Sequence, residues 1–303
     1  MTFPPPTTER GLRILHLSDT HLFGDGSLHY GRVDTLAALE RVLDRAAELD
    51  RVDVVVASGD LSDDGSEESY RLLASRVGPW ADARDAAVVY AMGNHDLRPG
   101  FEAVLGAREA VTEVAGFRIV SVDTSVPGAG YGSIDAAQLD RLRDVLATPS
   151  PHGTVVVLHH PPVPASSALL AALELQSPHD LLEVCAAGDV RLILAGHYHH
   201  ALAAEAHGIP VVVAPGIANT ADPIARPGTE RATIGSGFAL IDLPGVTDAD
   251  AHDPAHDPAH DRARAAAPRV LFVAAPSADD GAELFDLDAA EVERIAAAAG
   301  PAA

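Results

Sequence analysis

The chain has 303 residues, with 44 acidic against 21 basic side chains and a formal net charge of −23. This charge argues against a protein that binds nucleic acid through its phosphates, and against one that docks on anionic lipid. The single cysteine, Cys185, excludes an intrachain disulfide and a cysteine-based zinc site.

Short apolar runs rich in β-branched residues are predicted to form strands buried on both faces. They are 14–17, 54–57, 88–91, 154–158 and 192–195. Amphipathic segments between them are predicted to be helices, at 35–49, 66–77, 135–146 and 180–187. Closely spaced strands are expected after residue 199, at 201–206, 209–214, 238–243, 270–273 and 283–287. This order indicates a layered α/β fold in one domain, with an antiparallel or mixed second sheet packed on the first.

The chain ends and one repeat are set apart from this domain. We predict a flexible N-terminus at 1–11, the domain at 12–288 and a C-terminal tail at 289–303. A low-complexity loop, 246–268, contains a His-Asp-Pro-Ala repeat of period four. Because its prolines preclude a regular helix, we expect a disordered loop, with weak adventitious metal binding as the alternative.

No apolar stretch approaches the ~18 residues that a membrane-spanning helix needs. The first residues also lack the basic and apolar regions of a signal peptide. We therefore expect a cytoplasmic protein with no membrane partner.

Polar clusters directly follow the five buried strands. They are Asp19-Thr20-His21, Gly59-Asp60, Gly93-Asn94-His95-Asp96, His159-His160-Pro161-Pro162 and Gly196-His197-Tyr198-His199-His200. In an open α/β sheet the carboxyl ends of the strands form the ligand crevice. Each motif alone is compatible with a turn or a surface histidine, but all of them at strand ends together predict one joint metal site. Imidazole and carboxylate ligands without thiolate are typical of borderline divalent metals.

In this order the motifs resemble those of the calcineurin-like metallophosphoesterase superfamily, over about residues 12–215. The segment 59–65, the Gly-Asn-His-Asp motif and Gly208-Ile209-Pro210-Val211 are similar to the class III cyclic-nucleotide phosphodiesterase branch, which includes bacterial cAMP phosphodiesterases and glycerophosphodiesterases. The resemblance implies an α/β fold, a four-layer αββα sandwich with two mixed β-sheets, and a dinuclear metal site at the carboxyl ends of the strands.

The resemblance also implies the ligands of two divalent or transition metal ions, which could be Mn, Fe, Zn or Co. The first ion would be held by Asp19, His21 and His199, and the second by Asn94, His159 and His197, with Asp60 bridging the two. His159 is preferred to His160 because the first histidine of the pair fits the family position.

The third motif is expected to act on the substrate as well. His95 would stand over the open face as the catalytic acid, and Asp96 would orient its ring. Asn94, His95 and Arg98 would contact the substrate phosphate, with an ordinary place on a helix surface as the alternative for Arg98. His29 is interpreted as a surface or loop residue.

Two metals in such a site would hold a bridging hydroxide that attacks phosphorus while His95 protonates the leaving alkoxide. Acidic residues, Asp63 and Asp64, stand where protein phosphatases of the superfamily are basic, so a small monoanionic diester is favoured. We expect a cyclic nucleotide, 3′,5′- or 2′,3′-cAMP, or a similar diester. A glycerophosphodiesterase or a broad phosphomonoesterase is the alternative, and a non-catalytic scaffold is disfavoured by the complete ligand set. A homodimer rests on the resemblance alone, and no nucleic-acid partner is expected.

Overall fold

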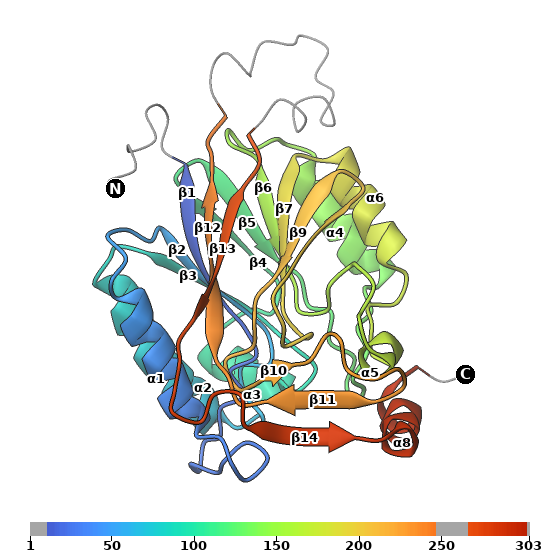
Figure 1. Ribbon diagram of the computed structural model, residues 1–303. Helices are drawn as coiled ribbons and strands as arrows, with labels where there is room; N and C mark the ends of the chain where they lie inside the picture. The colour runs from blue at the N-terminus through green and yellow to red at the C-terminus, as the bar shows by residue number, and fades with distance from the viewer. Residues whose placement is uncertain (1–10, 247–265, 302–303) are drawn as a thin grey trace.

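The computed structural model describes residues 11–246 and 266–301, and two mixed sheets form its centre (Figure 1). One contains β1 (Leu12–Leu17), β2 (Val54–Ser58), β3 (Ala87–Ala91), β12 (Gly237–Leu243) and β13 (Arg269–Ala274), in the order β13-β12-β1-β2-β3. The other contains β4 (Ala110–Val114), β5 (Phe117–Ser121), β6 (Thr154–Val157), β7 (Val190–Ala195), β8 (Leu202–Ala206) and β9 (Ile209–Val213), in the order β4-β5-β6-β7-β9-β8. A small third sheet, in the order β10-β11-β14, is formed by β10 (Thr220–Ala221), β11 (Glu230–Thr233) and β14 (Glu283–Leu287).

Helices cover the outer faces of both large sheets, as Figure 1 shows. Beside the first sheet lie α1 (Thr35–Ala46), α2 (Glu67–Asp82) and α3 (Arg98–Val104). Beside the second lie α4 (Ala136–Leu146) and α6 (Pro178–Ala187). Two further helices, α5 (Ala168–Ala172) and α8 (Ala289–Ala299), pack on each other near the small sheet. The predicted four-layer αββα sandwich is confirmed.

Three apolar layers hold these elements together. Between the two sheets, residues such as Ile14, Val54, Phe117 and Leu192 are fully buried. One further cluster lies between the first sheet and its helices, and another lies between the second sheet and its helices. Since both faces of the central strands are covered, β2 is buried along its whole length. Its continuous apolar run is the sequence signature of that position.

The division of strands between the two sheets differs from the prediction. The strands that follow residue 199 are divided among three sheets: β12 pairs antiparallel with β1, β9 pairs parallel with β7, and only β10, β11 and β14 form a separate small sheet. The hairpin of β4 and β5 was not predicted, although β5 is fully buried. Hydrophobic patterns identify a strand but not its partner, because pairing joins segments far apart in the chain.

The predicted loop 246–268 lies mostly outside the described residues, and the repeat at 251–261 lies there entirely. The predicted C-terminal tail contains α8, which begins with a capping box: Asp288 Oδ1 accepts a hydrogen bond from Glu291 N (3.0 Å), and Glu291 Oε2 accepts one from Asp288 N (2.9 Å). Among the described residues, no helix combines the length and the apolar character that crossing a membrane requires.

A buried histidine in β1 leads to a prediction about pH and stability. His16 is fully buried, its Nε2 hydrogen-bonds the Ser58 hydroxyl at 2.8 Å, and burial lowers its pKa to about 3. Below pH 6.5 the unfolded chain therefore binds a proton that the folded chain does not, so stability falls as pH falls. Between pH 7 and pH 5 this loss amounts to about 2 kcal/mol.

We expect His16→Gln, which can keep the bond to Ser58, to lose less stability than the wild type over this pH range. Urea unfolding at pH 7 and pH 5 measures the difference directly. Equal pH dependence in the two proteins would mean that His16 is protonated in the folded state.

Candidate metal centre

The predicted ligands lie where parallel strands end at one edge of each sheet. Asp19 follows β1 and Asp60 follows β2, which are parallel neighbours, while His159 follows β6 and His197 follows β7. Ligand atoms of Asp19, His21, Asp60 and His199 all lie within 4.8 Å of one another, and so do those of His159, His160 and His197. The fold therefore brings the predicted strand-end residues together.

The backbone at these positions is unusual. The φ angle is +53° at Asp19, +43° at His21, +47° at Asp60, +69° at His197 and +51° at His199. Non-glycine residues rarely occupy this left-handed region, because the Cβ atom crowds the backbone there. Such strained positions cluster at functional sites, where the surrounding structure enforces them.

Asp19, His21 and His199 form the first predicted group. The Nε2 of His199 lies 3.3 Å from Asp19 Oδ1 and 3.2 Å from the Nε2 of His21. The Nδ1 of His21 donates a hydrogen bond to Asp63 Oδ1 at 2.8 Å, which leaves its Nε2 lone pair directed at the group. A carboxylate behind a ring in this way is the usual support for a metal-binding histidine.

Asp60 lies between this group and the second one. Its Oδ2 is 3.6 Å from the Nε2 of His21 and 3.3 Å from the Nε2 of His159. Its Oδ1 accepts a hydrogen bond from the backbone N–H of His95 at 2.8 Å. A carboxylate in this position is suited to bridging two metal ions, as the resemblance implies.

In the second group, three side-chain nitrogen or oxygen atoms could serve as metal ligands. His159 donates from Nδ1 to the carbonyl of Ser58 (2.8 Å), and its buried Nε2 has no hydrogen-bond partner. The buried Oδ1 of Asn94 has none either. His197 donates from Nε2 to the carbonyl of Leu173 (3.0 Å), which leaves Nδ1 as its ligand atom. Buried polar atoms without partners are costly, and a bound metal ion would satisfy them.

The protonation states of the candidate histidine ligands are compatible with metal binding. Burial lowers the pKa of His21 to about 4 and that of His199 to about 3, so both rings are neutral near pH 7, the form that binds metal. Burial also lowers the pKa of His159, but the charges of Asp60 and Asp19 outweigh it and raise the value to about 9. A metal ion at His159 would therefore displace a proton. The donor set fits the predicted divalent metals.

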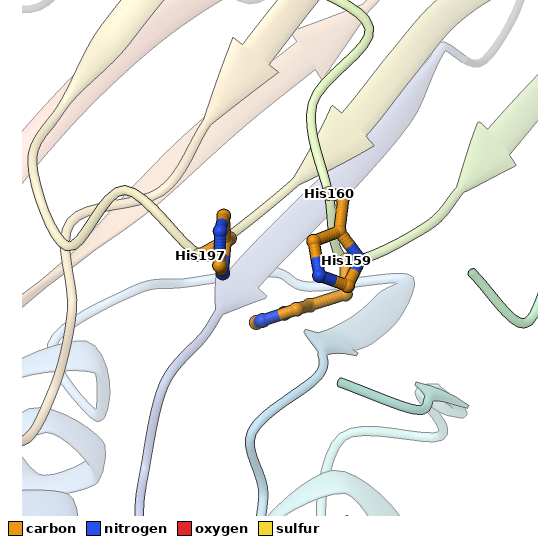
Figure 2. Close-up of side chains that lie close together, drawn as sticks. All are labelled: His159, His160 and His197. Atoms are coloured by element: carbon orange, nitrogen blue, oxygen red, sulfur yellow. The ribbon is translucent and has the colours of Figure 1, made fainter. Parts of the chain in front are cut away.

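His160 lies beside this group but has no nitrogen to offer. Figure 2 shows it next to His159 at the end of β6, with His197 opposite. Its Nδ1 hydrogen-bonds the Thr124 hydroxyl (2.8 Å), and its Nε2 donates to the carbonyl of Gly130 (3.2 Å). These bonds support His159 as the ligand, although both rings lie within 5.1 Å of the His197 ring.

We expect His159→Ala to lose at least one equivalent of bound metal and His160→Ala to lose none, because only His159 directs a ring nitrogen, Nε2, at Asp60 and the ligand group. Elemental analysis of reconstituted proteins measures this. His160→Ala should instead lower the free energy of unfolding by about 1–3 kcal/mol, since it leaves buried groups without partners. Metal loss in His160→Ala alone would reverse the assignment.

The residues that follow Asn94 are placed differently from the prediction. The carboxylate of Asp96 accepts hydrogen bonds from the backbone N–H groups of Leu61 (3.1 Å), Ser62 (3.0 Å) and Gly93 (2.8 Å) and makes none to His95. Asp96 therefore fixes the two ligand-bearing loops to each other and does not orient the His95 ring. Burial raises its pKa to about 6.

The carboxylate nearest the His95 ring in these contacts is Asp63, whose Oδ1 lies 3.5 Å from its Nδ1. The same oxygen lies 3.4 Å from the Nδ1 of His29, which is buried and not at the surface as expected. Burial raises the pKa of Asp63, but hydrogen bonds from His21 and His29 hold it well below its usual range. Sequence reasoning placed His29 at the surface and treated Asp63 only as an acidic residue that favours a diester, so neither was expected to contact the rings of the site.

An open cleft of about 150 Å³ leads to the candidate ligands. Its inner wall includes Asp60, Asn94, His95 and His197. Arg98 does not line it: its guanidinium lies 3.2 Å from the carbonyl oxygen of Ser125 and 3.5 Å from Asp123. The structure therefore favours the alternative reading of Arg98 as a residue held in the helix surface.

Comparisons with known proteins agree with the family resemblance that the sequence motifs indicate. The family model described as calcineurin-like phosphoesterase matches residues 12–201. A probable cyclic nucleotide phosphodiesterase of Rhodococcus erythropolis is 42% identical over 74% of this chain and 76% of its own length. A cAMP/cGMP dual specificity phosphodiesterase of Mycobacterium tuberculosis is 39% identical over 76% of this chain and 75% of its own length.

The crystal structure of a dimetal phosphatase from Danio rerio has a TM-score of 0.52 to this chain, covering 88% of it and 99% of that chain. At 15% sequence identity this likeness concerns the fold alone. Together the matches confirm the predicted resemblance and the predicted phosphoester hydrolase, and the donor set supports divalent metal ions as its cofactor. The chain therefore belongs to the calcineurin-like phosphoesterase family.

Proposed function

We propose that the protein is a phosphodiesterase that hydrolyses 3′,5′-cyclic nucleotides with the help of two metal ions. The observation that carries the proposal is the convergence of both ligand groups on Asp60, which His21 and His159 face from opposite groups, next to a buried Asn94 oxygen without a hydrogen-bond partner. The names of the relatives in Rhodococcus erythropolis and Mycobacterium tuberculosis support a cyclic nucleotide as the substrate.

Seven side chains would hold the two ions, with Asp60 shared. One ion would be held by Asp19, His21 and His199, and the other by Asn94, His159 and His197. When bound, such ions supply positive charge for the phosphoryl oxygens and acidify water near neutral pH. Mn, Fe, Zn and Co all accept this set of imidazole, carboxylate and amide ligands.

His95 is the residue we propose as general acid. Its side chain is 44% exposed in the cleft, and its backbone N–H is tied to Asp60 Oδ1, so the ring stands at the edge of the ligand cluster. There it can contact the substrate and give a proton to the departing ribose oxygen. Asp63 Oδ1 lies 3.5 Å from Nδ1 of this ring, where it can orient the ring in the cleft.

The charge of the cleft favours a diester over a monoester. Among the described residues, no arginine lines the cleft, and the sequence contains no lysine. A phosphomonoester carries about one more negative charge near neutral pH than a diester does, and it would need further positive groups. The lining therefore supports the cyclic nucleotide over the phosphomonoester.

A substrate panel on metal-reconstituted protein tests the proposal. It comprises 3′,5′-cAMP, 2′,3′-cAMP, glycerophosphocholine, bis-p-nitrophenyl phosphate and p-nitrophenyl phosphate. We expect the highest kcat/KM on 3′,5′-cAMP, and at least tenfold less on p-nitrophenyl phosphate, about 1.4 kcal/mol of barrier. A preference for glycerophosphocholine would reject a cyclic nucleotide in favour of a glycerophosphodiester.

A further inference from the structure

A row of aromatic rings runs from the candidate metal ligands toward Tyr30 and Phe285. The ring centroids of His21 and His29 are 4.8 Å apart, and those of His29 and Tyr30 are 4.5 Å apart. Tyr30 then meets Phe285 of β14 at 5.1 Å, with 50° between the ring planes. All four residues line the same cleft. The last two rings therefore form an aromatic surface connected to the reaction centre.

Of these two rings, Tyr30 lies largely outside the core, and Phe285 packs only in part on a small buried cluster. Tyr30 is a large aromatic side chain that is 61% exposed. Phe285 is half-buried and is held in register opposite Ala232, because β14 pairs with β11. Leaving aromatic area open beside a cleft is unfavourable unless something covers it. Leu169, Leu170 and Leu173 add further apolar lining to this cleft.

A buried carboxylate lines the same cleft as the two rings. Glu230, in β11, is 3% exposed and lines the cleft, and its Oε2 has no hydrogen-bond partner. Tyr30 and Phe285 line the same cleft. A buried acceptor without a donor costs free energy, which a ligand N–H group would recover. The cleft that the rings line thus also contains one hydrogen-bond acceptor without a donor.

We infer that Tyr30, Phe285 and Glu230 form the subsite for the nucleobase of the substrate, with the base stacked on the Tyr30 ring, its edge against Phe285, and its exocyclic amine donating to Glu230. The inference rests on the proposed function and specifies its substrate class as the purine nucleotides that carry an amine. Flat apolar surface together with one buried acceptor suits a planar ring with an N–H edge. A quaternary ammonium group, the other ligand of aromatic cages, has no N–H to offer that acceptor.

The first experiment tests the platform by steady-state kinetics with two substrates: 3′,5′-cAMP and the 3′,5′-cyclic phosphate of 1-O-methylribose, which has no base. Stacking on an aromatic side chain changes affinity by roughly 5- to 150-fold. We expect Tyr30→Ala to raise KM for cAMP within this range with little change in kcat, and to leave the base-free substrate unaffected. Tyr30→Phe, which keeps the ring, should behave like the wild type.

The second experiment tests the acceptor. The comparison substrate is the 3′,5′-cyclic phosphate of purine riboside, which is cAMP without its amine. We expect the wild type to favour cAMP over this analogue by about tenfold or more, as a hydrogen bond to a charged group allows, and Glu230→Leu to lose that preference. Glu230→Gln serves as a second variant of the same size, and turnover of the base-free substrate verifies that each variant is folded.

The outcomes separate this inference from the proposed function. If Tyr30→Ala affects cAMP and the base-free substrate equally, or if Glu230→Leu keeps the preference for the amine, the subsite is wrong although the protein cleaves cyclic nucleotides. If Tyr30→Ala instead raises KM for glycerophosphocholine, the platform serves a quaternary ammonium group. If the wild type cleaves no cyclic nucleotide but cleaves other diesters, the proposed function itself fails.

Discussion

Replacing Asp60 with asparagine should remove most bound metal and lower turnover about a thousandfold, equivalent to about 4 kcal/mol of barrier. The physical reason is that this carboxylate lies between the two ligand groups, 3.6 Å from His21 Nε2 and 3.3 Å from His159 Nε2. Without its charge, two cations would face each other across a neutral amide. Elemental analysis and kcat/KM on a cyclic nucleotide measure the two effects.

Asparagine is the informative substitution because it preserves the local structure. It tolerates the left-handed backbone at Asp60, where φ is +47°, and its amide oxygen can still accept from His95 N. A matched control is Asp85→Asn, an exposed aspartate with φ of +53° in the turn after α2. It should keep the metal content and turnover of the wild type. Full metal occupancy in Asp60→Asn would reject a bridging role for Asp60.

Replacing His95 with alanine should lower turnover of a cyclic nucleotide by roughly 10²–10⁴-fold, the usual contribution of a general acid. The ribose oxygen is a strongly basic leaving group and needs a proton as it departs. A p-nitrophenolate is stable as an anion, so bis-p-nitrophenyl phosphate should lose much less. Both metal ions should remain, because no ligand role is assigned to the exposed His95 ring.

The competing explanation is that His95 only positions the phosphate. In that case both substrates would lose the same factor while metal content stays at the wild-type level. Loss of metal would instead mean that His95 supports the ligand cluster, through the contacts of its backbone and ring with Asp60 and Asp63. The ratio of the two substrate effects, measured together with metal content, therefore distinguishes the three roles.

Much of the centre could be predicted from the sequence because the fold links local pattern to position. A buried parallel strand has a continuous apolar run, and the residue after it lies at the ligand-binding edge of the sheet. Asp19, Asp60 and His197 each follow such a run. Residues without that link were misread: His29 lies in a segment with no strand pattern, yet it is buried against Asp63.

The sequence by itself indicated the layered α/β class and the family, because strand patterns and motifs lie within a few residues, and the family resemblance then implied the αββα layers and the candidate ligands. Only the tertiary structure decided that β1 pairs with β12 and that Asp96 binds backbone N–H groups and not the His95 ring. It also decided that Tyr30, Glu230 and Phe285 line one cleft. It also supported His159 over His160 as the ligand, because the bond from His159 Nδ1 to Ser58 leaves Nε2 facing the site, whereas His160 uses its Nε2 to bind the carbonyl of Gly130. These decisions depend on contacts between residues far apart in the chain, where side-chain geometry and burial act and local patterns carry no information.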